Sequence, residues 1–230
     1  MNRLMKIITD IFFPNRCPFC DGFIKWDRLV CEKCEKELPL TGEELCEKCG
    51  KSPCECSELL NYDRVYSVCY YKDKAKKAVL DLKSSNSSNS AEYFASVLSE
   101  KILCDDIKYD YIVPVPMSKS KKRKRGYNQA EEIAVKLSER AGIPVSDSLI
   151  YKVENESEQH SLNEKERSEY VKTIFFCNDK AELKGKKILL CDDVFTTGST
   201  VSYCAYLLKK LGAEYIGAAV IAVTERHYKQ

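Results

Sequence analysis

The stretch Ile188–Thr200, ILLCDDVFTTGST, decides the fold of this chain. Its apolar beginning predicts a buried strand, two aspartates end that strand, and a helical pattern starts directly after the Thr/Gly turn. In parallel sheets this layout occurs at the carboxyl end of a strand, where a helix N-terminus faces phosphate and ribose groups. The stretch therefore predicts a phosphosugar site at the edge of a parallel sheet.

The chain beyond Tyr62 alternates between two hydrophobic patterns. Strand-like runs cover Val65–Tyr71, Tyr111–Val115, Lys187–Leu190 and Tyr215–Val223, and helical patterns cover Lys74–Leu82, Glu92–Cys104, Asn128–Ala141 and Ser199–Leu211. Such alternation is typical of an α/β fold, in which a mostly parallel twisted sheet carries helices on both faces. We therefore expect residues 61–230 to form one domain of this class.

Composition argues against several other classes of protein. The 230 residues carry a formal net charge of +2, from 37 basic and 35 acidic side chains, so no overall charge commits the chain to nucleic acid. No apolar run approaches the ~18 residues that a membrane-spanning helix needs. Residues 1–13 have a basic start and no small-residue cleavage site, which favours a short amphipathic helix over a signal peptide. We expect a cytoplasmic protein without a membrane span.

A cysteine-rich module occupies residues 14–60. Of the 13 cysteines in the chain, eight lie there, as the pairs Cys17/Cys20, Cys31/Cys34, Cys46/Cys49 and Cys54/Cys56. Two Cys-x-x-Cys turns can complete a tetrahedral zinc site, so we expect one or two structural Zn²⁺ ions, two if the pairs are used in sequence. The pairing of the thiols stays open, because Cys54-x-Cys56 is tighter than the usual zinc-ribbon turn. A redox pair or free thiols are the alternative.

The polar half of the stretch Ile188–Thr200 offers two kinds of binding group. Asp192 and Asp193 are adjacent carboxylates that repel each other unless cations or hydroxyls receive them, and a ribose diol and Mg²⁺ would supply both. The turn that follows offers backbone N–H groups and hydroxyls to a phosphate, through Thr196, Thr197, Gly198, Ser199 and Thr200. The alternative is an ordinary capped helix, but a cap needs one such residue rather than four hydroxyls and two aspartates.

This stretch resembles the phosphoribosyl pyrophosphate (PRPP) signature of type I phosphoribosyltransferases. In that family an acidic pair holds the ribose hydroxyls and a Thr/Gly loop holds the 5-phosphate. The resemblance implies the first role for Asp192 and Asp193 and the second for residues 196–200.

A narrower resemblance covers nearly the whole chain. The run Pro114-Val115-Pro116, followed by Arg123, Arg125 and Gly126-Tyr127-Asn128-Gln129, is similar to the ComF family of competence-associated proteins, and so is Gln159-x2-Leu162-x4-Arg167 leading to Phe175. Members of that family also carry an N-terminal double zinc ribbon. This chain departs from the family pattern at Ser118, Lys121 and Tyr170.

The basic run KSKKRKR, Lys119–Arg125, follows a predicted strand. Transferases of this type place their pyrophosphate-binding loop there, and arginine can grip phosphate with two hydrogen bonds. We therefore expect Arg123 and Arg125 to bind pyrophosphate. One alternative is that the run contacts a nucleic-acid backbone, and another is that it forms a solvated loop without a ligand. The lysines of the run could also be merely solvated.

The segment Tyr151–Lys172 is charged and poor in apolar residues. Related transferases keep a flexible loop at this point, which closes over bound PRPP. By that resemblance Gln159 and Arg167 lie near the ligand. The alternative is that both are surface residues without a role in binding.

Two functions follow from these patterns. The ComF resemblance implies a PRPP-binding protein that acts in DNA uptake during natural transformation, with Mg-PRPP as ligand and with single-stranded DNA and a DNA-translocating helicase as candidate partners. The alternative is an active phosphoribosyltransferase that moves phosphoribose to a nitrogenous acceptor and releases pyrophosphate. The sequence shows no general acid or base and does not indicate the acceptor. A third reading, a zinc-dependent adaptor with a degenerate site, is weakened by the complete Asp-Asp and Thr/Gly loop.

Overall fold

A four-stranded parallel sheet lies at the centre of the computed structural model, which describes residues 15–25, 27–54, 56, 60–82, 88–154 and 164–225. The strand order is β1 (Arg64–Tyr70), β6 (Tyr215–Val223), β5 (Lys187–Phe195) and β2 (Tyr111–Pro114). The central strands β5 and β6 are nearly continuous apolar runs because helices cover both of their faces. The predicted α/β class and parallel sheet are confirmed.

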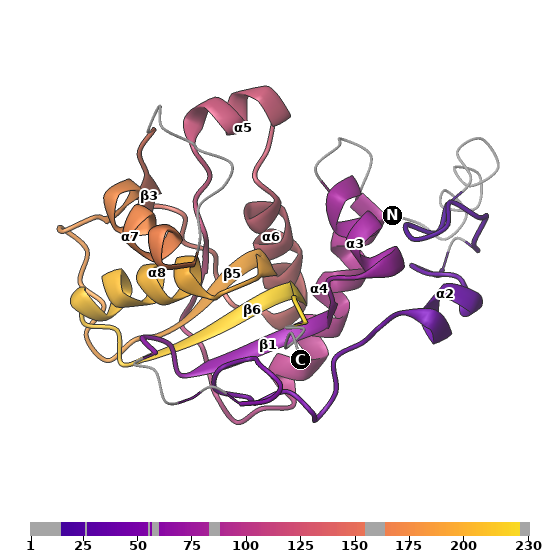
Figure 1. Cartoon of the computed structure of the whole chain (residues 1–230), viewed down its shortest axis with the longest axis horizontal. Coiled ribbons are helices and arrows are strands. Elements are labelled where there is room, and N and C mark those ends of the chain that lie inside the picture. Colours follow the sequence, from indigo (N-terminus) through magenta and orange to yellow (C-terminus); the bar gives the residue numbers. More distant parts are fainter. Residues whose placement is uncertain are drawn as a thin grey trace.

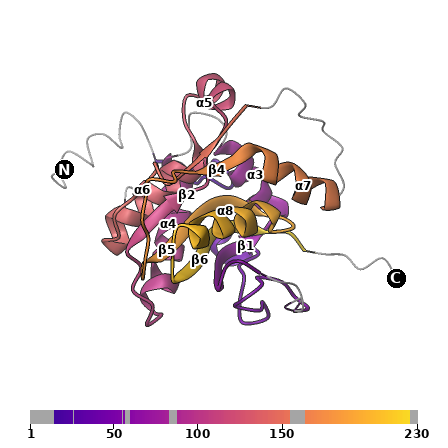
Figure 2. The same cartoon turned by 90° about the vertical axis from the view of Figure 1, so that its left-hand side faces the viewer.

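Two hydrophobic cores lie on opposite faces of this sheet, and helices cover both faces (Figures 1 and 2). Helices α3 (Asp73–Asp81), α4 (Ser88–Leu103) and α6 (Gln129–Ala141) pack on one face. Helices α7 (Glu164–Ile174) and α8 (Ser199–Lys210) cover the other, together with the antiparallel pair β3 (Ile150–Lys152) and β4 (Phe175–Cys177). The short helix α5 (Lys119–Arg125) stands at the top of both views, apart from the helices on the sheet.

Three elements differ from their sequence-based prediction. Strand β5 continues to Phe195, because β6 is long enough to pair with it as far as Phe195↔Val223. Asp192 and Asp193 therefore lie within the strand rather than behind it. The run Lys119–Arg125 is helical rather than a loop, and it ends at Gly126, whose φ of 87° is left-handed. In the segment 151–172, the described residues contribute to β3 and α7 instead of forming a loop throughout.

The cysteine-rich module, which includes α2 (Glu32–Glu37), lies along the free edge of β1. The N–H of Thr41 donates to the carbonyl of Val68 over 3.0 Å, and the N–H of Val65 donates to the carbonyl of Glu47 over 2.7 Å. The module thereby satisfies backbone groups that an edge strand leaves unpaired. The helix predicted for residues 1–13 lies outside the described residues. None of the helices described here is long and apolar enough to cross a membrane.

Candidate functional site

A cavity of 370 Å³, here called the carboxylate cavity, opens where β2 and β5 end and where α6 and α8 begin. Residues from seven segments line it: Val115–Met117, Lys121 and Arg125, Asn128–Ala130, Lys152, the group Tyr170, Val171, Ile174 and Phe175, the run Asp192–Val194, and Thr196, Thr197, Ser199 and Thr200. The carboxyl ends of parallel strands are the usual position for a ligand in this fold class. The predicted aspartates and the Thr/Gly loop thus meet in one cavity.

Two adjacent aspartates supply the negative charge of this cavity. Asp192 and Asp193 are half-buried, and each carboxylate accepts the N–H of the residue that follows it, at 2.9 Å and 2.7 Å. Burial and the neighbouring Asp193 raise the pKa of Asp192 well above its ordinary value. A cation or hydroxyl donors would relieve the repulsion between these two carboxylates, so their chemistry fits both Mg²⁺ and a ribose diol.

The Thr/Gly loop turns the chain from β5 into α8. Gly198 has a φ of 79°, and a Cβ atom there would lie 2.5 Å from Cζ of Phe195, so only glycine allows this turn. Gly198, which has no side chain, is the N-cap of α8, so neither Ser199 nor Thr200 is the cap. The hydroxyl of Thr197 accepts the N–H of Ser199, the first residue of the helix, over 3.4 Å. The hydroxyls of Thr197 and Ser199 lie 2.8 Å apart at this positive helix end, where an anion is stabilised.

Three cationic side chains complete the lining. Lys121 and Arg125 come from one face of α5, four residues apart, and Lys152 comes from β3. Arg123, which the sequence favoured as a ligand, is not among the lining residues: its side chain is 80% exposed and approaches Glu154 at 3.9 Å. The i,i+4 spacing of Lys121 and Arg125 was the available signal for this helix face. Nothing in the sequence pattern marked Lys152.

Asn128 fixes the junction between the α5 segment and α6. It is buried, its amide donates to the carbonyl of Val115 over 3.0 Å, and its Oδ1 accepts the N–H of Ala130 over 3.2 Å. The hydroxyl of Tyr127 also donates to the carbonyl of Leu82, at the end of α3. These bonds hold the start of α6 against the cavity.

The two other residues predicted near the ligand are not placed here. Gln159 lies outside the described residues. Arg167 lies in α7, but its side chain is outside the described set. Tyr170 of the same helix, one of the departures from the family pattern, lines the carboxylate cavity.

The eight cysteines of the module gather in two groups of four. The Sγ atoms of Cys17, Cys20, Cys31 and Cys34 lie within 4.8 Å of one another, and so do those of Cys46, Cys49, Cys54 and Cys56. The pairs are thus used in sequence, including the tight Cys54-x-Cys56. Four thiolates at this separation suit tetrahedral Zn²⁺.

Backbone hydrogen bonds prepare one thiol in each group for a metal. The N–H of Cys34 donates to Cys31 and lowers the pKa of that thiol to about 7. The N–H of Cys49 acts in the same way on Cys46, whose pKa falls to about 6. Zinc binds the thiolate, so these bonds favour the metal-binding form.

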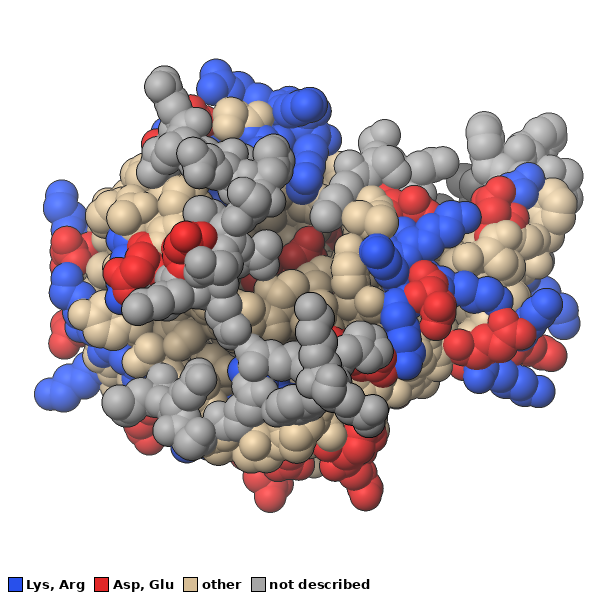
Figure 3. Space-filling model, viewed as in Figure 1, with Lys and Arg blue, Asp and Glu red and all other residues tan. Residues whose placement is uncertain are grey.

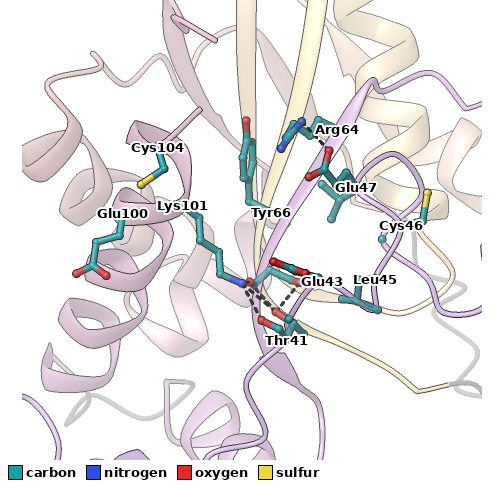
Figure 4. A pocket seen from close by; sticks show the side chains of 14 residues that line it. Thr41, Glu43, Leu45, Cys46, Glu47, Arg64, Tyr66, Glu100, Lys101 and Cys104 are labelled. Atoms are coloured by element: carbon teal, nitrogen blue, oxygen red, sulfur yellow. Dashed lines mark hydrogen bonds and ion pairs between the residues drawn. The ribbon is translucent and has the colours of Figure 1, made fainter. Parts of the chain in front are cut away.

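A second and larger cavity of 760 Å³, here called the ribbon cavity, lies between the second cysteine group, β1 and the end of α4 (Figure 4). Both basic side chains among its lining residues have protein partners: Arg64 contacts Glu47 at 3.0 Å and Asp105 at 2.7 Å. The ammonium of Lys101 donates to the carbonyls of Thr41 and Ser67, at 3.0 Å and 2.8 Å. Burial lowers the pKa of this lysine.

Two family models match the chain. The phosphoribosyl transferase domain model matches residues 89–230, and the double zinc ribbon domain model matches residues 8–70. Together with the parallel sheet and the cysteine groups, these matches define the class: a protein with a phosphoribosyltransferase domain and a double zinc ribbon, in which zinc is structural. Because the ribbon model extends over β1, the domain boundary at residue 60 stays a prediction.

Competence protein ComFC of Streptococcus pneumoniae is 30% identical to this chain, over 82% of this chain and 84% of its own. The chain therefore belongs to the ComF family. Competence protein F of Haemophilus influenzae is 28% identical, over 89% of this chain and 95% of its own. DNA utilization protein YhgH of Escherichia coli is 27% identical, over 86% and 85% respectively.

Proposed function

We propose that the carboxylate cavity binds Mg-PRPP. The observation that supports this most directly is the meeting of Asp192 and Asp193 with the Thr/Gly loop and three cations in one cavity. PRPP carries a phosphate, a diol and a pyrophosphate, and each has a matching group here.

In this proposal, each part of the cavity receives one part of the ligand. The hydroxyls and N–H groups of residues 196–200 bind the 5-phosphate at the start of α8. The carboxylates of Asp192 and Asp193 accept the ribose hydroxyls and offer oxygen ligands of the kind that Mg²⁺ prefers. Bound Mg²⁺ would neutralise part of the pyrophosphate charge, and Lys121 and Arg125 face the same group from α5.

We propose a cytoplasmic role in DNA uptake, in line with the names of the competence-protein relatives. The cytoplasm keeps zinc-binding thiols reduced. Figure 3 shows basic side chains gathered over α5, and those of Lys119, Arg123 and Lys124 are exposed. We propose this outer face as a contact for single-stranded DNA, delivered by a DNA-translocating helicase.

Calorimetry and phosphorus NMR of the zinc-loaded protein test the ligand. We expect Mg-dependent binding of PRPP, and a loss of at least about a hundredfold in affinity when Asp192→Asn and Asp193→Asn are combined. The matched control is Asp147→Asn, at an exposed aspartate away from the cavity. Unchanged affinity in the double variant would remove the carboxylates from the site.

The same NMR experiment separates a binding protein from a transferase. PRPP that binds and stays intact in the presence of nucleobases supports a binding role. Protein-dependent release of pyrophosphate that requires an added base identifies the alternative, an active phosphoribosyltransferase.

The DNA contact is tested by charge reversal at Lys119, Arg123 and Lys124. We expect weaker binding of single-stranded DNA and a shallower salt dependence, because fewer phosphates are neutralised. Reversal of Lys108, an exposed lysine that precedes β2 whereas α5 follows it, is the control. Equal affinity in both variants would exclude this face of α5.

A further inference from the structure

Gln129 is the first residue of α6 and lines the carboxylate cavity. Gln129 is only 2% exposed, although its side chain ends in a polar amide. It follows Asn128, whose two hydrogen bonds fix the start of the helix. The position of the Gln129 side chain is therefore set by the fold before any ligand binds.

Within the part of the chain that the structure describes, the amide nitrogen of Gln129 has no hydrogen-bond partner. Among the described residues, Nε2 of Gln129 is the one buried side-chain nitrogen or oxygen atom in this condition. The other end of the amide is satisfied, because Nη1 of Arg125 donates to Oε1 over 3.4 Å. This contact fixes the orientation of the amide, so that the N–H₂ group is the end without a partner. A buried donor left in this state destabilises the folded protein.

The surroundings of this donor favour an anion. Lys121 and Arg125 line the same cavity, Arg125 contacts Gln129 directly, and the N-terminal end of the 13-residue helix α6 contributes positive partial charge on this wall. This wall comes from a different part of the chain than the Thr/Gly loop at the start of α8. The cavity thus has two anion-attracting walls, and the aspartates belong to the strand that leads to the second of them.

We propose that Nε2 of Gln129 donates a hydrogen bond to an oxygen of the pyrophosphate group of PRPP. The inference rests on the proposed function and adds a residue for which sequence reasoning gave no role. It makes Gln129 selective: the amide recognises a ligand that extends to the α6 wall, and a phosphosugar without pyrophosphate does not reach it.

The test compares PRPP with ribose 5-phosphate by calorimetry in the presence of Mg²⁺, on the zinc-loaded full chain. Gln129→Met keeps the length of the side chain and removes the donor. We expect PRPP affinity to fall by about tenfold or more, as for the loss of a hydrogen bond to a charged group, while ribose 5-phosphate affinity stays within about twofold. The melting temperature without ligand stays equal or rises, because the buried donor is gone.

Two further variants keep the result interpretable. Gln129→Glu retains the acceptor for Arg125 but puts a negative charge where we place the pyrophosphate, so it weakens PRPP binding more than Gln129→Met does. Glu139→Met, at an exposed position near the other end of α6, changes neither ligand's affinity.

Each outcome bears on the proposal. Wild-type PRPP affinity in both Gln129 variants overturns it, and so does an equal loss for ribose 5-phosphate, which would mean that the amide only shapes the cavity. Failure of the wild-type protein to bind either compound instead overturns the proposed function itself, and the Gln129 inference with it.

Discussion

The ribbon cavity and the carboxylate cavity differ in how their charged groups are arranged. The ribbon cavity is the larger, at 760 Å³ against 370 Å³ for the carboxylate cavity. In the ribbon cavity the cations already have protein partners, since Arg64 contacts two carboxylates and Lys101 donates to two backbone carbonyls. In the carboxylate cavity, Asp192 has a raised pKa, and the N–H₂ group of Gln129 has no partner among the residues that the structure describes.

This difference, rather than volume, is the reason why we propose the smaller cavity as the binding site. Charges that satisfy one another hold two parts of a protein together, and here they hold the zinc module against β1. Charges and donors that the fold leaves unsatisfied cost stability until a ligand supplies the missing partner. We therefore expect changes in the ribbon cavity to alter stability and changes in the carboxylate cavity to alter ligand binding.

The largest effect is expected from Cys49→Ser, which breaks the second cysteine group at a fully buried thiol and removes a wall of the ribbon cavity. Loss of that zinc should lower stability by on the order of 5 kcal/mol, because metal binding supplies much of the folding energy of so small a module. Native mass spectrometry should count one zinc instead of two, and the melting temperature should fall. Cys104→Ser, at an exposed cysteine of the same cavity, is the control. Two zinc ions in Cys49→Ser would contradict the assignment.

A smaller effect is expected from Lys101→Met. It removes the hydrogen bonds to Thr41 and Ser67 and leaves two buried carbonyls without this donor, which should cost about 1–3 kcal/mol. Denaturant unfolding measures the loss, and Lys77→Met, at an exposed lysine of α3, serves as control. PRPP affinity should stay within about twofold. A tenfold change in PRPP affinity in Lys101→Met would contradict the view that the ribbon cavity serves stability and the carboxylate cavity serves binding.

The smallest effect is a pH-dependent one at Asp192. Its folded-state pKa is raised, so the ionised carboxylate costs stability above that pKa, and the cost disappears as the pH falls and the group becomes protonated. Without Mg²⁺ or PRPP, Asp192→Asn should therefore melt about 2–4 °C higher than wild type near neutral pH. The gain should shrink toward acidic pH, whereas Asp147→Asn should show no such trend. A gain that grows on acidification would contradict the direction of the pKa shift.

The parts of the fold that sequence predicts best are those whose residues are neighbours in the chain. The cysteine pairs form their groups because each pair is one turn, and the Thr/Gly loop follows its strand directly. The full length of β5 was not predictable, since its last residues become a strand only by pairing with β6. The helical state of α5 had local signals, Ser118 as N-cap and Gly126 as C-cap, which the run of charges concealed.

The candidate site was predictable only in part, for the same reason. Asp192 and Asp193 stand together in the sequence, whereas Lys152 and Tyr170 reach the cavity from β3 and α7. The unpartnered amide of Gln129 depends on Arg125 and on the burial of the start of α6. Properties of this kind arise from tertiary packing and have no counterpart in residue spacing.

The attachment of the zinc module to β1 has a consequence for solubility. Strand β1 is one outer strand of the sheet, and segment 39–47 occupies its free edge through backbone hydrogen bonds. At the opposite side, the N–H of Ile112 in β2 donates to Pro144, and its carbonyl accepts the N–H of Ser146. An uncovered outer strand is a template on which further copies of a chain can stack. Zinc in the second cysteine group would help to keep segment 39–47 on this edge, so we expect removal of zinc to expose β1 and to promote aggregation.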